Sequence, residues 1–587
     1  MTLFVSRVRS RRIAAALLTC VTVVALTGCV GLPESGPVVE AGSEGSLDEP
    51  PAIFIDPKPP EPGESPDQIV NDFLEAQTAT PLSTNVARQY LTGDADAAWD
   101  PEAETITYAD SSMPRGTDTV TVRLVGADRL DSRGSFRGPL PAARRSIDFP
   151  MELEDGEWRI ADAPDALIVP DSWFEQRFRQ VSLYFFDPSA QVLVPEPVFV
   201  QRGESSTTAL TEALLRGPGP TLDDVSRSFI PPGLDFDLSV PVSKDGVADL
   251  SLRGYSGQLT PEASELMITQ LVWTLSQEPT IEAIRVSIGG QQITSATGQS
   301  LFSVDEASVY DPTGLDSSSL FYGLRDGLMV SGQPDALAPV TGPMGTTEIG
   351  VRSLAVDLDA TTVAAISSEG DQALLASVDG PRRRVEEVAR NADNLLRPAW
   401  DLADRLWLVD ATSGGAVVTY VEDGEPRELE VSGVSHRKVT QFLVSRDGSR
   451  LVAVVRGPQG DHLVVSRLQR NDQGGIIGAT PARPIGWEGE ISLRIRDIAW
   501  TSPTSLAVLH RVAGQIYEVR TISVDGSPSG ADDLLTQLSG PVRALAGSPA
   551  PLESLYAVMD TGLDDLTRGD AGDVEIDPPV TFIDYVG

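Results

Sequence analysis

The chain has 587 residues, which at about 150 residues per domain predicts three or four domains. Its 85 acidic residues outnumber its 45 basic residues, giving a net charge of -40. This balance removes the main driving force for binding a phosphate backbone, so nucleic acid is excluded as a partner class. Hydrophobic residues make up 41% of the chain and charged residues 22%, as in ordinary globular proteins, so most of the chain is expected to fold.

Both cysteines lie near the amino terminus, at Cys20 and Cys29. The rest of the chain therefore cannot contain a disulfide framework, a CxxC redox pair or a cysteine-ligated zinc site. Arginines at positions 7, 9, 11 and 12 precede an apolar run from Ile13 to Thr27. This pattern is typical of an export signal, and the run is shorter than the ~20 residues that a membrane-spanning helix needs.

The tetrapeptide Leu26-Thr27-Gly28-Cys29 resembles a bacterial lipobox. Its small residues allow a signal peptidase to cut before a cysteine whose thiol already carries diacylglycerol. The resemblance predicts cleavage after Gly28 and a diacylglyceryl thioether and N-acyl chain, such as palmitate, on Cys29. Several acyl chains exceed what stable membrane anchoring requires. The alternative is an uncleaved anchor in which Cys29 is an ordinary apolar residue.

A Pro-rich and acidic segment follows, from residue 31 to 66, with Lys58 as its one basic residue. Proline bias and self-repulsion keep such a segment extended, and it cannot bury a core. We interpret it as a tether that holds an acidic body off an anionic membrane surface.

Helices precede strands in the first predicted folded unit. Ser65-Pro66-Asp67-Gln68 has the pattern of a capping box with Pro at the first helical position, and a second short helix is expected around Val86 to Leu91. Alternating segments then predict strands at Thr105–Tyr108, Val120–Leu124, Ile147–Leu153 and Trp158–Ala161. This order predicts an α+β cone with a curved antiparallel sheet. Its aromatic residues are expected to fill the core, although a ligand pocket inside the cone is the alternative.

A second unit is predicted from Val181 onward as an α/β sandwich with two helices on one sheet. The first helix begins near Thr207 and stops at Gly217-Pro218, and the second opens at a capped start, Thr260-Pro261-Glu262. Strands are expected at SLYFFD, VLVPEPVFV, Phe236–Val242, Val247–Leu252 and Ala283–Ile288.

Quasi-repeats mark the carboxy-terminal half. Trp400 and Trp500 each precede an alternating strand, and FLVSRDGSRLVAVV places an Asp-Gly turn between two strands. Spacings of roughly 45 residues predict a β-propeller of about five to seven four-stranded blades. A pair of β-sandwiches is the alternative. The terminal segment Val580–Gly587 is a candidate strand for closing the ring.

Several of these segments resemble known families. ALTEALLRGP from Ala209, VADLS from Val247 and QLVWTL from Gln270 resemble, in this order, the GerMN domain of sporulation and cell-envelope proteins. DQIVNDFLEAQ, VARQYL and AAWDP resemble the NTF2-like amino-terminal domain of LpqB-type lipoproteins of high-GC Gram-positive bacteria. The SRDGSRL segment is similar to turns of TolB-type and WD40-like propellers. Together with the lipobox, these segments identify the chain as a member of the LpqB family.

The predicted fold class is therefore multidomain, with α+β and all-β parts. The predicted boundaries are 1–28 for the signal peptide, 29–65 for the tether, 66–175 for the NTF2-like domain, 176–300 for the GerMN domain and 301–587 for the β-propeller.

Enzyme motifs are scarce. The three lysines, Lys58, Lys244 and Lys438, do not fit a phosphate-binding loop, which excludes nucleotide hydrolysis by that route. The three histidines, His436, His462 and His510, have no HExxH pattern, and no GxSxG elbow occurs. We expect no catalytic site, cofactor, metal or bound nucleotide. The cluster Asp94, Asp96 and Asp100 lacks the Gly and closing Glu of a calcium loop and is interpreted as structural charge.

The LpqB resemblance implies a function. These lipoproteins associate with the extracytoplasmic domain of the sensor histidine kinase MtrB and modulate the MtrA/MtrB two-component system, which affects cell-wall homeostasis and division. We therefore expect a non-enzymatic protein, lipid-anchored at the extracytoplasmic face of the cell membrane. Two alternatives are an envelope glycan-binding or glycan-cleaving protein that uses a carboxylate pair, and a TolB-like periplasmic assembly scaffold.

Overall fold

The computed structural model describes residues 56–587 except 204, 220, 221, 223, 237, 238, 256, 296, 381–383, 487–492, 529–534 and 568–572. The predicted signal peptide, the lipobox and most of the tether lie outside the described residues. Within the described part of the chain, no helix is both long and apolar enough to cross a membrane.

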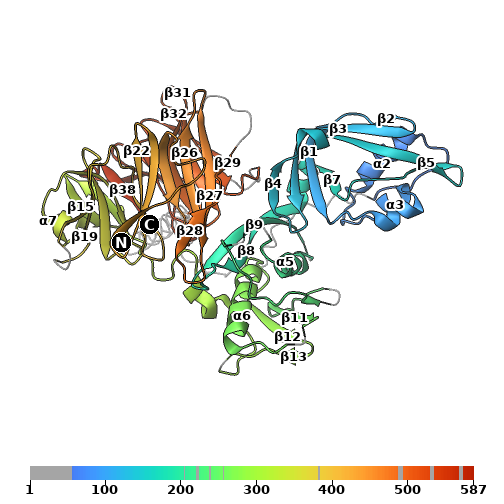
Figure 1. Cartoon of the computed structure of the whole chain (residues 1–587), viewed down its shortest axis with the longest axis horizontal. Coiled ribbons are helices and arrows are strands. Elements are labelled where there is room, and N and C mark those ends of the chain that lie inside the picture. Colours follow the sequence, from blue (N-terminus) through green and yellow to red (C-terminus); the bar gives the residue numbers. More distant parts are fainter. Residues whose placement is uncertain are drawn as a thin grey trace, which may run out of the picture. The chain divides into compact units, whose positions relative to one another are not determined.

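The first folded segment packs helix α2, Pro66–Ala76, against a seven-stranded sheet (Figure 1). Its main strand order is β6-β5-β3-β1-β7, and β2 and β4 also pair with β3. The predicted strands are present, but β7 was not predicted and pairs parallel with β1, so the sheet is mixed rather than antiparallel. The remaining elements are the 3-10 helices Ala87–Tyr90 and Ala142–Arg144, α3 Gly93–Ala98, β1 Glu104–Ser111, β2 Arg115–Gly116, β3 Thr119–Asp131, β4 Phe136–Pro139, β5 Ser146–Glu154, β6 Glu157–Ile160 and β7 Leu167–Pro170.

The two predicted helix starts differ in their capping. Helix α2 begins at Pro66 as predicted, but Ser65 makes no side-chain cap hydrogen bond. Gln68 Nε2 donates to Asp72 Oδ1 at 2.7 Å, and the predicted capping box does not form. Thr260 does cap the later helix, where its Oγ1 accepts from Ala263 N at 3.1 Å. The second predicted helix is a single 3-10 turn, Ala87–Tyr90.

The middle segment contains a long hairpin and a small sheet. Strands β8, Phe178–Phe186, and β9, Leu193–Gln201, pair with each other in a separate two-stranded sheet, so the helices cover two sheets rather than one. Within the predicted strand Phe236–Val242, the described residues form the end of β10, Asp235–Phe236, and an isolated bridge at Val242. The other elements are α4 Asp171–Arg177, α5 Ser206–Leu215, β11 Val247–Arg253, α6 Pro261–Leu275, β12 Ala283–Ile288, β13 Gln291–Gln292 and the 3-10 helix Val304–Tyr310.

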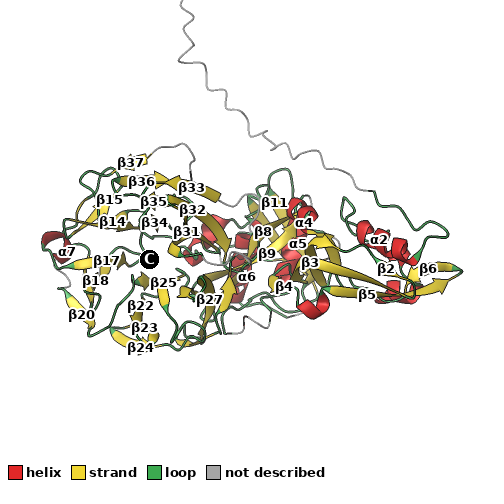
Figure 2. Cartoon of the chain, turned by 90° about the horizontal axis from the view of Figure 1, so that it is seen from above, coloured by secondary structure: helices red, strands yellow, loops and turns green. Residues whose placement is uncertain are grey.

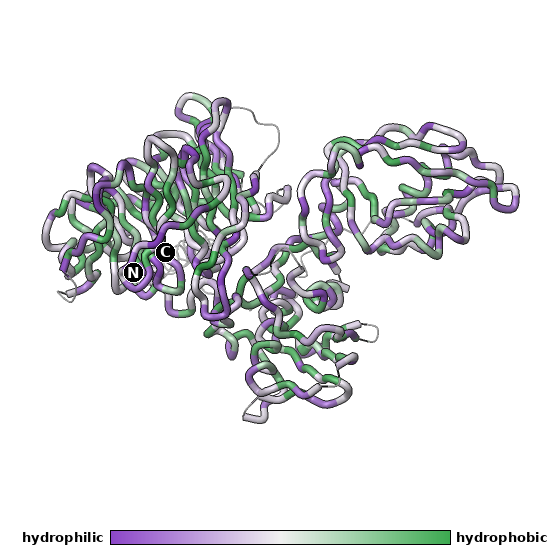
Figure 3. Tube along the Cα trace, in the orientation of Figure 1, coloured by the Kyte–Doolittle hydropathy of each residue, from purple (hydrophilic) through white to green (hydrophobic). Residues whose placement is uncertain are grey.

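The carboxy-terminal half is a β-propeller. Six sheets of the described chain have the propeller order, and Figure 2 shows them arranged around the carboxy terminus. The terminal strand β38 pairs with β14 and supplies the inner strand of the first blade, so the predicted ring closure is confirmed. Hydrophobic residues follow the blade strands in Figure 3. Neighbouring blades share buried hydrophobic clusters.

The blades are formed, in chain order, by the following elements. The first has β14 Phe321–Arg325, β15 Leu328–Gly332, β16 Ala338–Pro339 and β38 Phe582–Asp584, and is followed by α7 Pro343–Thr346; the second has β17 Val351–Val356, β18 Thr362–Ser367, β19 Ala373–Ser377 and β20 Glu386–Ala389; the third has β21 Ala399–Trp400, β22 Leu406–Thr412, β23 Gly415–Glu422 and β24 Glu425–Glu428. The fourth has β25 Val439–Val444, β26 Arg450–Arg456, β27 Asp461–Arg470, β28 Ile476–Ala479 and β29 Arg483–Ile485; the fifth has β30 Ile495–Ser502, β31 Ser505–Ala513, β32 Ile516–Ser523 and β33 Leu535–Ser539; the sixth has β34 Ala544–Ala546, β35 Tyr556–Val558, β36 Gly562–Asp565 and β37 Asp573–Glu575.

The tryptophan repeat seen in the sequence marks a repeated contact between blades. Trp400 Nε1 donates to Ala355 O at 3.2 Å, and Trp500 Nε1 donates to Val444 O at 3.1 Å. In each case the acceptor belongs to the inner strand of the preceding blade. A buried indole needs such a partner, so the repeat fixes how successive blades pack.

Arg446 connects the two ends of the propeller. It lies in the Asp-Gly turn between β25 and β26, and its side chain is 2% exposed. Its guanidinium donates to Thr313 O, Ser317 Oγ, Ser548 Oγ and Val586 O at 3.0 to 3.2 Å. Burial lowers the pKa of Arg446 to about 10, despite the nearby Glu553 carboxylate. One side chain therefore holds the segment that enters the propeller, the sixth blade and the closing carboxy terminus.

We expect Arg446→Ala to lower the free energy of unfolding by about 3–5 kcal/mol, because the buried acceptors and the Glu553 carboxylate lose their partner. Urea unfolding followed by tryptophan fluorescence measures this. Arg427→Ala is the control, since Arg427 is 52% exposed and pairs with Glu422 at 3.1 Å. It should cost less than about 1 kcal/mol. Equal unfolding midpoints for the two variants would contradict the role given to Arg446.

Candidate functional site

The residues predicted for lipidation, Leu26, Thr27, Gly28 and Cys29, lie outside the described residues. Their role therefore rests on the amino-acid sequence.

The residues considered for catalysis or metal binding do not come together. His462 and His510 lie on strands of different blades, and His436 is on an exposed turn. His510 is buried, with Nε2 3.7 Å from Glu518 Oε1. No group of His, Cys, Asp or Glu side chains among the described residues is arranged to hold a metal ion.

The aspartate cluster has the structural role predicted for it. Asp94 and Asp96 lie in the first turn of α3, where negative charge is favourable. Asp96 also pairs with Arg88, with Oδ1 3.0 Å from Nη1.

The β8–β9 hairpin is where the three folded segments meet. Phe199 N on β9 donates to Gly134 O of the amino-terminal segment at 2.8 Å. The inward face of the hairpin belongs to the same buried core as helices α5 and α6. Gln180 on β8 reaches the fifth blade, where its Nε2 lies within 3.0 to 3.2 Å of oxygens of Ser523, Asp525 and Ser527. A single hairpin thus contacts every folded part of the described chain.

Buried ion pairs hold this hairpin on the fourth blade. Arg450, whose side chain is fully buried, donates to Pro195 O and lies 3.4 Å from Glu196 Oε1. Arg467 pairs with the same Glu196 oxygen. At the hairpin turn, Arg470 lies 3.6 Å from Asp187. Burial lowers the pKa of Arg450, and the Asp447 and Asp525 carboxylates oppose this fall; burial also lowers the pKa of Arg467 to about 9, and the neighbouring Arg483 lowers it further.

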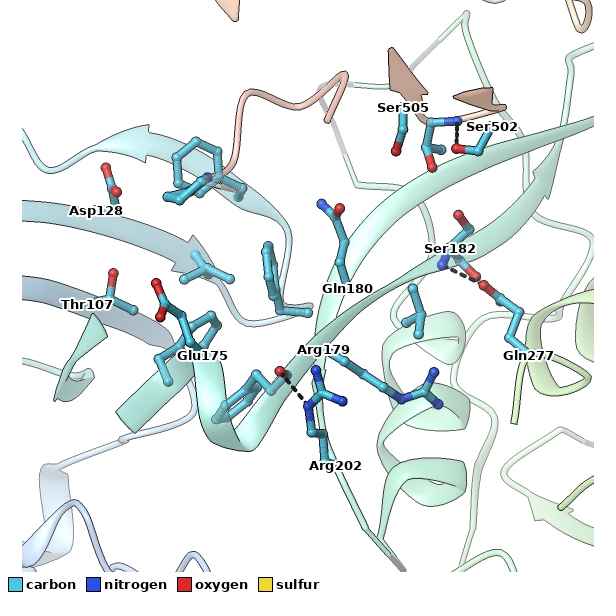
Figure 4. Close-up of a pocket in the computed structure, with 18 of the residues that line it drawn as sticks. Thr107, Asp128, Glu175, Arg179, Gln180, Ser182, Arg202, Gln277, Ser502 and Ser505 are labelled. Atoms are coloured by element: carbon cyan, nitrogen blue, oxygen red, sulfur yellow. Dashed lines mark hydrogen bonds between the residues drawn. The ribbon is translucent and has the colours of Figure 1, made fainter. Parts of the chain in front are cut away.

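A cavity of about 490 Å³ lies beside the hairpin (Figure 4). Its apolar wall is aromatic: the rings of Phe174 and Phe178 stack with centroids 4.5 Å apart, and Phe199 lies 5.3 Å from Phe174. Figure 4 shows Gln180 extending from the hairpin toward the side of the cavity where Ser502 and Ser505 lie. The cavity therefore has walls from the amino-terminal segment, the hairpin and the fifth blade.

Much of the lining of this cavity is polar or charged, and it includes the carboxylates of Asp128, Asp171 and Glu175. Gln277 Oε1 accepts from Ser182 N at 2.9 Å, and Arg179 pairs with Glu278. Burial raises the pKa of Asp171, and a hydrogen bond with Thr107 opposes that rise. The lining residues that the structure describes include no histidine, cysteine or lysine. The cavity offers aromatic rings, hydroxyl groups and amides beside these carboxylates, which are groups that can bind a polar ligand.

The sequence analysis identified these strands but missed their role. The patterns SLYFFD and VLVPEPVFV predict only strands, and the segment that contains Arg450 predicts only a turn. A signal was present at Glu196, which is a charged residue within an otherwise apolar segment. Such residues are rarely buried unless they are paired.

Comparison with family models divides the chain into three matched regions. Residues 59–175 match the model described as Lipoprotein LpqB, N-terminal domain. Residues 182–294 match the germane model, described as Sporulation and spore germination. Residues 327–564 match the Lipoprotein LpqB beta-propeller domain. The multidomain fold class predicted from the sequence, with GerMN and β-propeller parts, is confirmed.

Likeness to solved structures is distant. The first GerMN domain of the sporulation protein GerM from Bacillus subtilis is 21% identical, with a TM-score of 0.18, over 21% of this chain and 94% of that chain. A chain of a nidogen/laminin complex is 11% identical, with a TM-score of 0.33, over 45% of this chain and 97% of that chain.

Curated relatives align over most of their length. Lipoprotein LpqB of Cutibacterium acnes is 28% identical, covering 88% of this chain and 90% of the relative. Lipoprotein LpqB of Streptomyces coelicolor is 26% identical, covering 86% and 87%, and that of Mycobacterium bovis is 26% identical, covering 89% and 90%. With two LpqB domain models and full-length relatives in agreement, the chain belongs to the lipoprotein LpqB family.

Proposed function

We propose that this is a non-enzymatic lipoprotein, anchored through Cys29 at the extracytoplasmic face of the cell membrane. It binds the extracytoplasmic domain of a sensor histidine kinase, MtrB, and modulates an MtrA/MtrB-type two-component system, thereby influencing cell-wall homeostasis and division. The observation that carries this proposal is the lipobox Leu26-Thr27-Gly28-Cys29 at the head of a chain of the LpqB family. The kinase as partner comes from the family resemblance.

The described structure supports a binding role in two respects. The buried pairs between Glu196 and the fourth blade, together with the Gln180 contacts, hold the hairpin on the propeller, which gives a partner a preorganised surface. The cavity beside the hairpin has aromatic, hydroxyl and amide groups that can contact a ligand.

Cys29→Ala should abolish lipidation, because the thiol that carries the diacylglycerol is lost, and should release the chain from the membrane. Labelling with a palmitate analogue, followed by fractionation, measures both effects. Cys20→Ala is the matched control, since Cys20 lies in the predicted signal peptide and should leave labelling unchanged. Persistent labelling of Cys29→Ala would refute the lipobox assignment.

The mature chain carrying Cys29→Ala should bind the purified extracytoplasmic domain of the kinase in a pull-down and in calorimetry. Deletion of the lipoprotein should also alter phosphorylation of the response regulator in cells. The external domain of an unrelated sensor kinase serves as the binding control. Absence of binding together with normal phosphorylation in the deletion strain would rule out the kinase as partner.

A second candidate function, binding of an envelope glycan, is favoured by the aromatic and hydroxyl-lined cavity, because sugar rings contact aromatic faces and bond to hydroxyls and amides. In that case soluble peptidoglycan or arabinogalactan fragments should bind the mature chain, and Phe199→Ala should weaken binding at least about tenfold. Ser368→Ala, on a turn of the second blade, serves as the control. Calorimetry that detects no heat of binding with either glycan would remove this candidate.

A further inference from the structure

One end of the propeller carries basic residues on three successive blades. They lie where the inner strands β25, β30 and β34 begin, and on the second strands β26 and β31 that pair with them. On a chain with 85 acidic and 45 basic residues, such a group is a local reversal of charge. All of its members are exposed, and we call them the basic rim: Arg437, Lys438, Arg456, Arg494, Arg496, Arg511 and Arg543.

Hydrogen bonds between blades make the basic rim one continuous surface. Arg494 Nη1 of the fifth blade donates to Gly457 O of the fourth blade at 3.2 Å. Arg496 Nε of the fifth blade donates to Arg543 O of the sixth blade at 2.9 Å. The basic side chains of the three blades therefore lie side by side.

The carboxylates beside the basic rim are already paired. Asp461, whose side chain is fully buried, has Oδ1 2.8 Å from Arg494 Nη1 and 3.2 Å from Arg456 Nε. Asp560 Oδ1 lies 2.5 Å from Arg543 Nε. Because two arginines share one carboxylate, these contacts leave positive charge uncompensated.

The other basic side chains of the rim form no ion pair within the part of the chain that the structure describes: Arg437, Lys438, Arg496 and Arg511. Glu488 and Glu490 belong to the adjoining segment 487–492, which lies outside the described residues. Counting these two glutamates, the rim still has more basic than acidic residues. Exposed cations without a partner attract anionic ligands at short range.

The turn between β31 and β32 adds apolar side chains to the basic rim. Val512 is 52% exposed and Ile516 is 44% exposed. Arg511 precedes Val512, and the guanidinium carbon of Arg496 lies 5.6 Å from the centroid of the Tyr517 ring on the same hairpin. Apolar side chains beside cations suit the boundary between headgroups and acyl chains in an anionic bilayer.

The shape of this surface favours a membrane over a small anion. The described cavities on the propeller, including the one beside the hairpin, contain no residue of the basic rim. Its charge is spread over the ends of three blades, which suits a plane of lipid phosphate groups. Charges of the acidic body that lie more than about 8 Å from this plane are screened at physiological salt, so the rim dominates at contact.

The lipid anchor proposed at Cys29 keeps such a plane within reach. Residues 30–55, at about 3.3 Å each, span at most about 90 Å between the anchor and Asp56. A surface tethered at this distance meets the membrane at a high effective concentration, whereas an acidic protein would have to arrive by diffusion. This difference favours the membrane as the ligand of the basic rim.

We propose that the basic rim docks the propeller on the anionic surface of the membrane that holds Cys29, with Val512 and Ile516 in the headgroup region. The tether sets how far the acidic body can move from the membrane, and the basic rim sets which face turns toward it. The inference rests on the proposed lipid anchor as the source of the membrane, and it is independent of the kinase.

The experiment measures co-sedimentation of the mature chain carrying Cys29→Ala with vesicles of phosphatidylglycerol and phosphatidylcholine in equal amounts. Because this variant carries no lipid, the result does not depend on whether Cys29 is acylated. The chain should bind these vesicles and should not bind vesicles of phosphatidylcholine alone. Raising the salt to about 0.5 M should weaken binding at least about tenfold, since screening removes the attraction.

The charge of the rim is tested by combining Lys438→Glu with Arg496→Glu, at two exposed positions where folding should be undisturbed. Binding to the mixed vesicles should weaken at least about tenfold. The matched control combines Arg115→Glu with Lys244→Glu, which makes the same change of charge at exposed positions outside the propeller and should leave binding unchanged.

The apolar turn is tested by combining Val512→Ser with Ile516→Ser, which should weaken binding at least about threefold. Leu535→Ser on β33, where Leu535 is 61% exposed, is the control and should have no effect.

Three outcomes would overturn the proposal: no binding to the mixed vesicles, equal binding by the two charge-reversed pairs, or binding to poly-L-glutamate without binding to vesicles. The last outcome would make the basic rim a docking surface for an acidic protein. If labelling shows that Cys29 is acylated while these vesicle tests fail, the anchor stands and only the docking is removed.

Discussion

The arrangement of the folded segments depends on the buried ion pairs between β9 and the fourth blade. Arg450 is fully buried and Arg467 nearly so, and a guanidinium removed from water is costly unless a carboxylate compensates it. Glu196 contacts both guanidinium groups, and the buried Asp447 carboxylate also pairs with Arg450 at 3.5 Å. The hairpin that carries Glu196 also forms part of the core with α5 and α6 and contacts the amino-terminal segment. Holding the hairpin on the fourth blade therefore also holds the middle segment and the amino-terminal segment in place.

The cavity beside the hairpin is a consequence of this arrangement. Its aromatic wall comes from α4 and the hairpin, and its hydroxyl groups come from the fifth blade. Neither wall alone encloses a volume. If the cavity binds a ligand, the ligand contacts residues from three parts of the chain at once, which is a common location for binding sites.

Ring closure depends on a single buried side chain. Arg446 fixes the entering segment and the carboxy terminus of the propeller through four hydrogen bonds.

The amino-acid sequence by itself determined the elements that depend on local patterns. Helix α6 follows from the Thr260 cap, the blades follow from alternation and turns, and the repeated Trp400 and Trp500 mark the inner strands. Local expectations were wrong at Ser65, whose side chain does not cap α2, and where a partner strand was distant, as for β7. The assignment of a lipid anchor to Cys29 rests on the amino-acid sequence alone.

Only the tertiary structure decided which charged residues meet. Glu196 and Arg450 are 254 residues apart, and Glu553 and Arg446 belong to different blades. Periodicity and capping report on neighbours within a few residues, so they predict helices, strands and turns. The partner of a buried charge depends on how whole blades and hairpins pack, because desolvation is compensated only by groups that folding brings into contact.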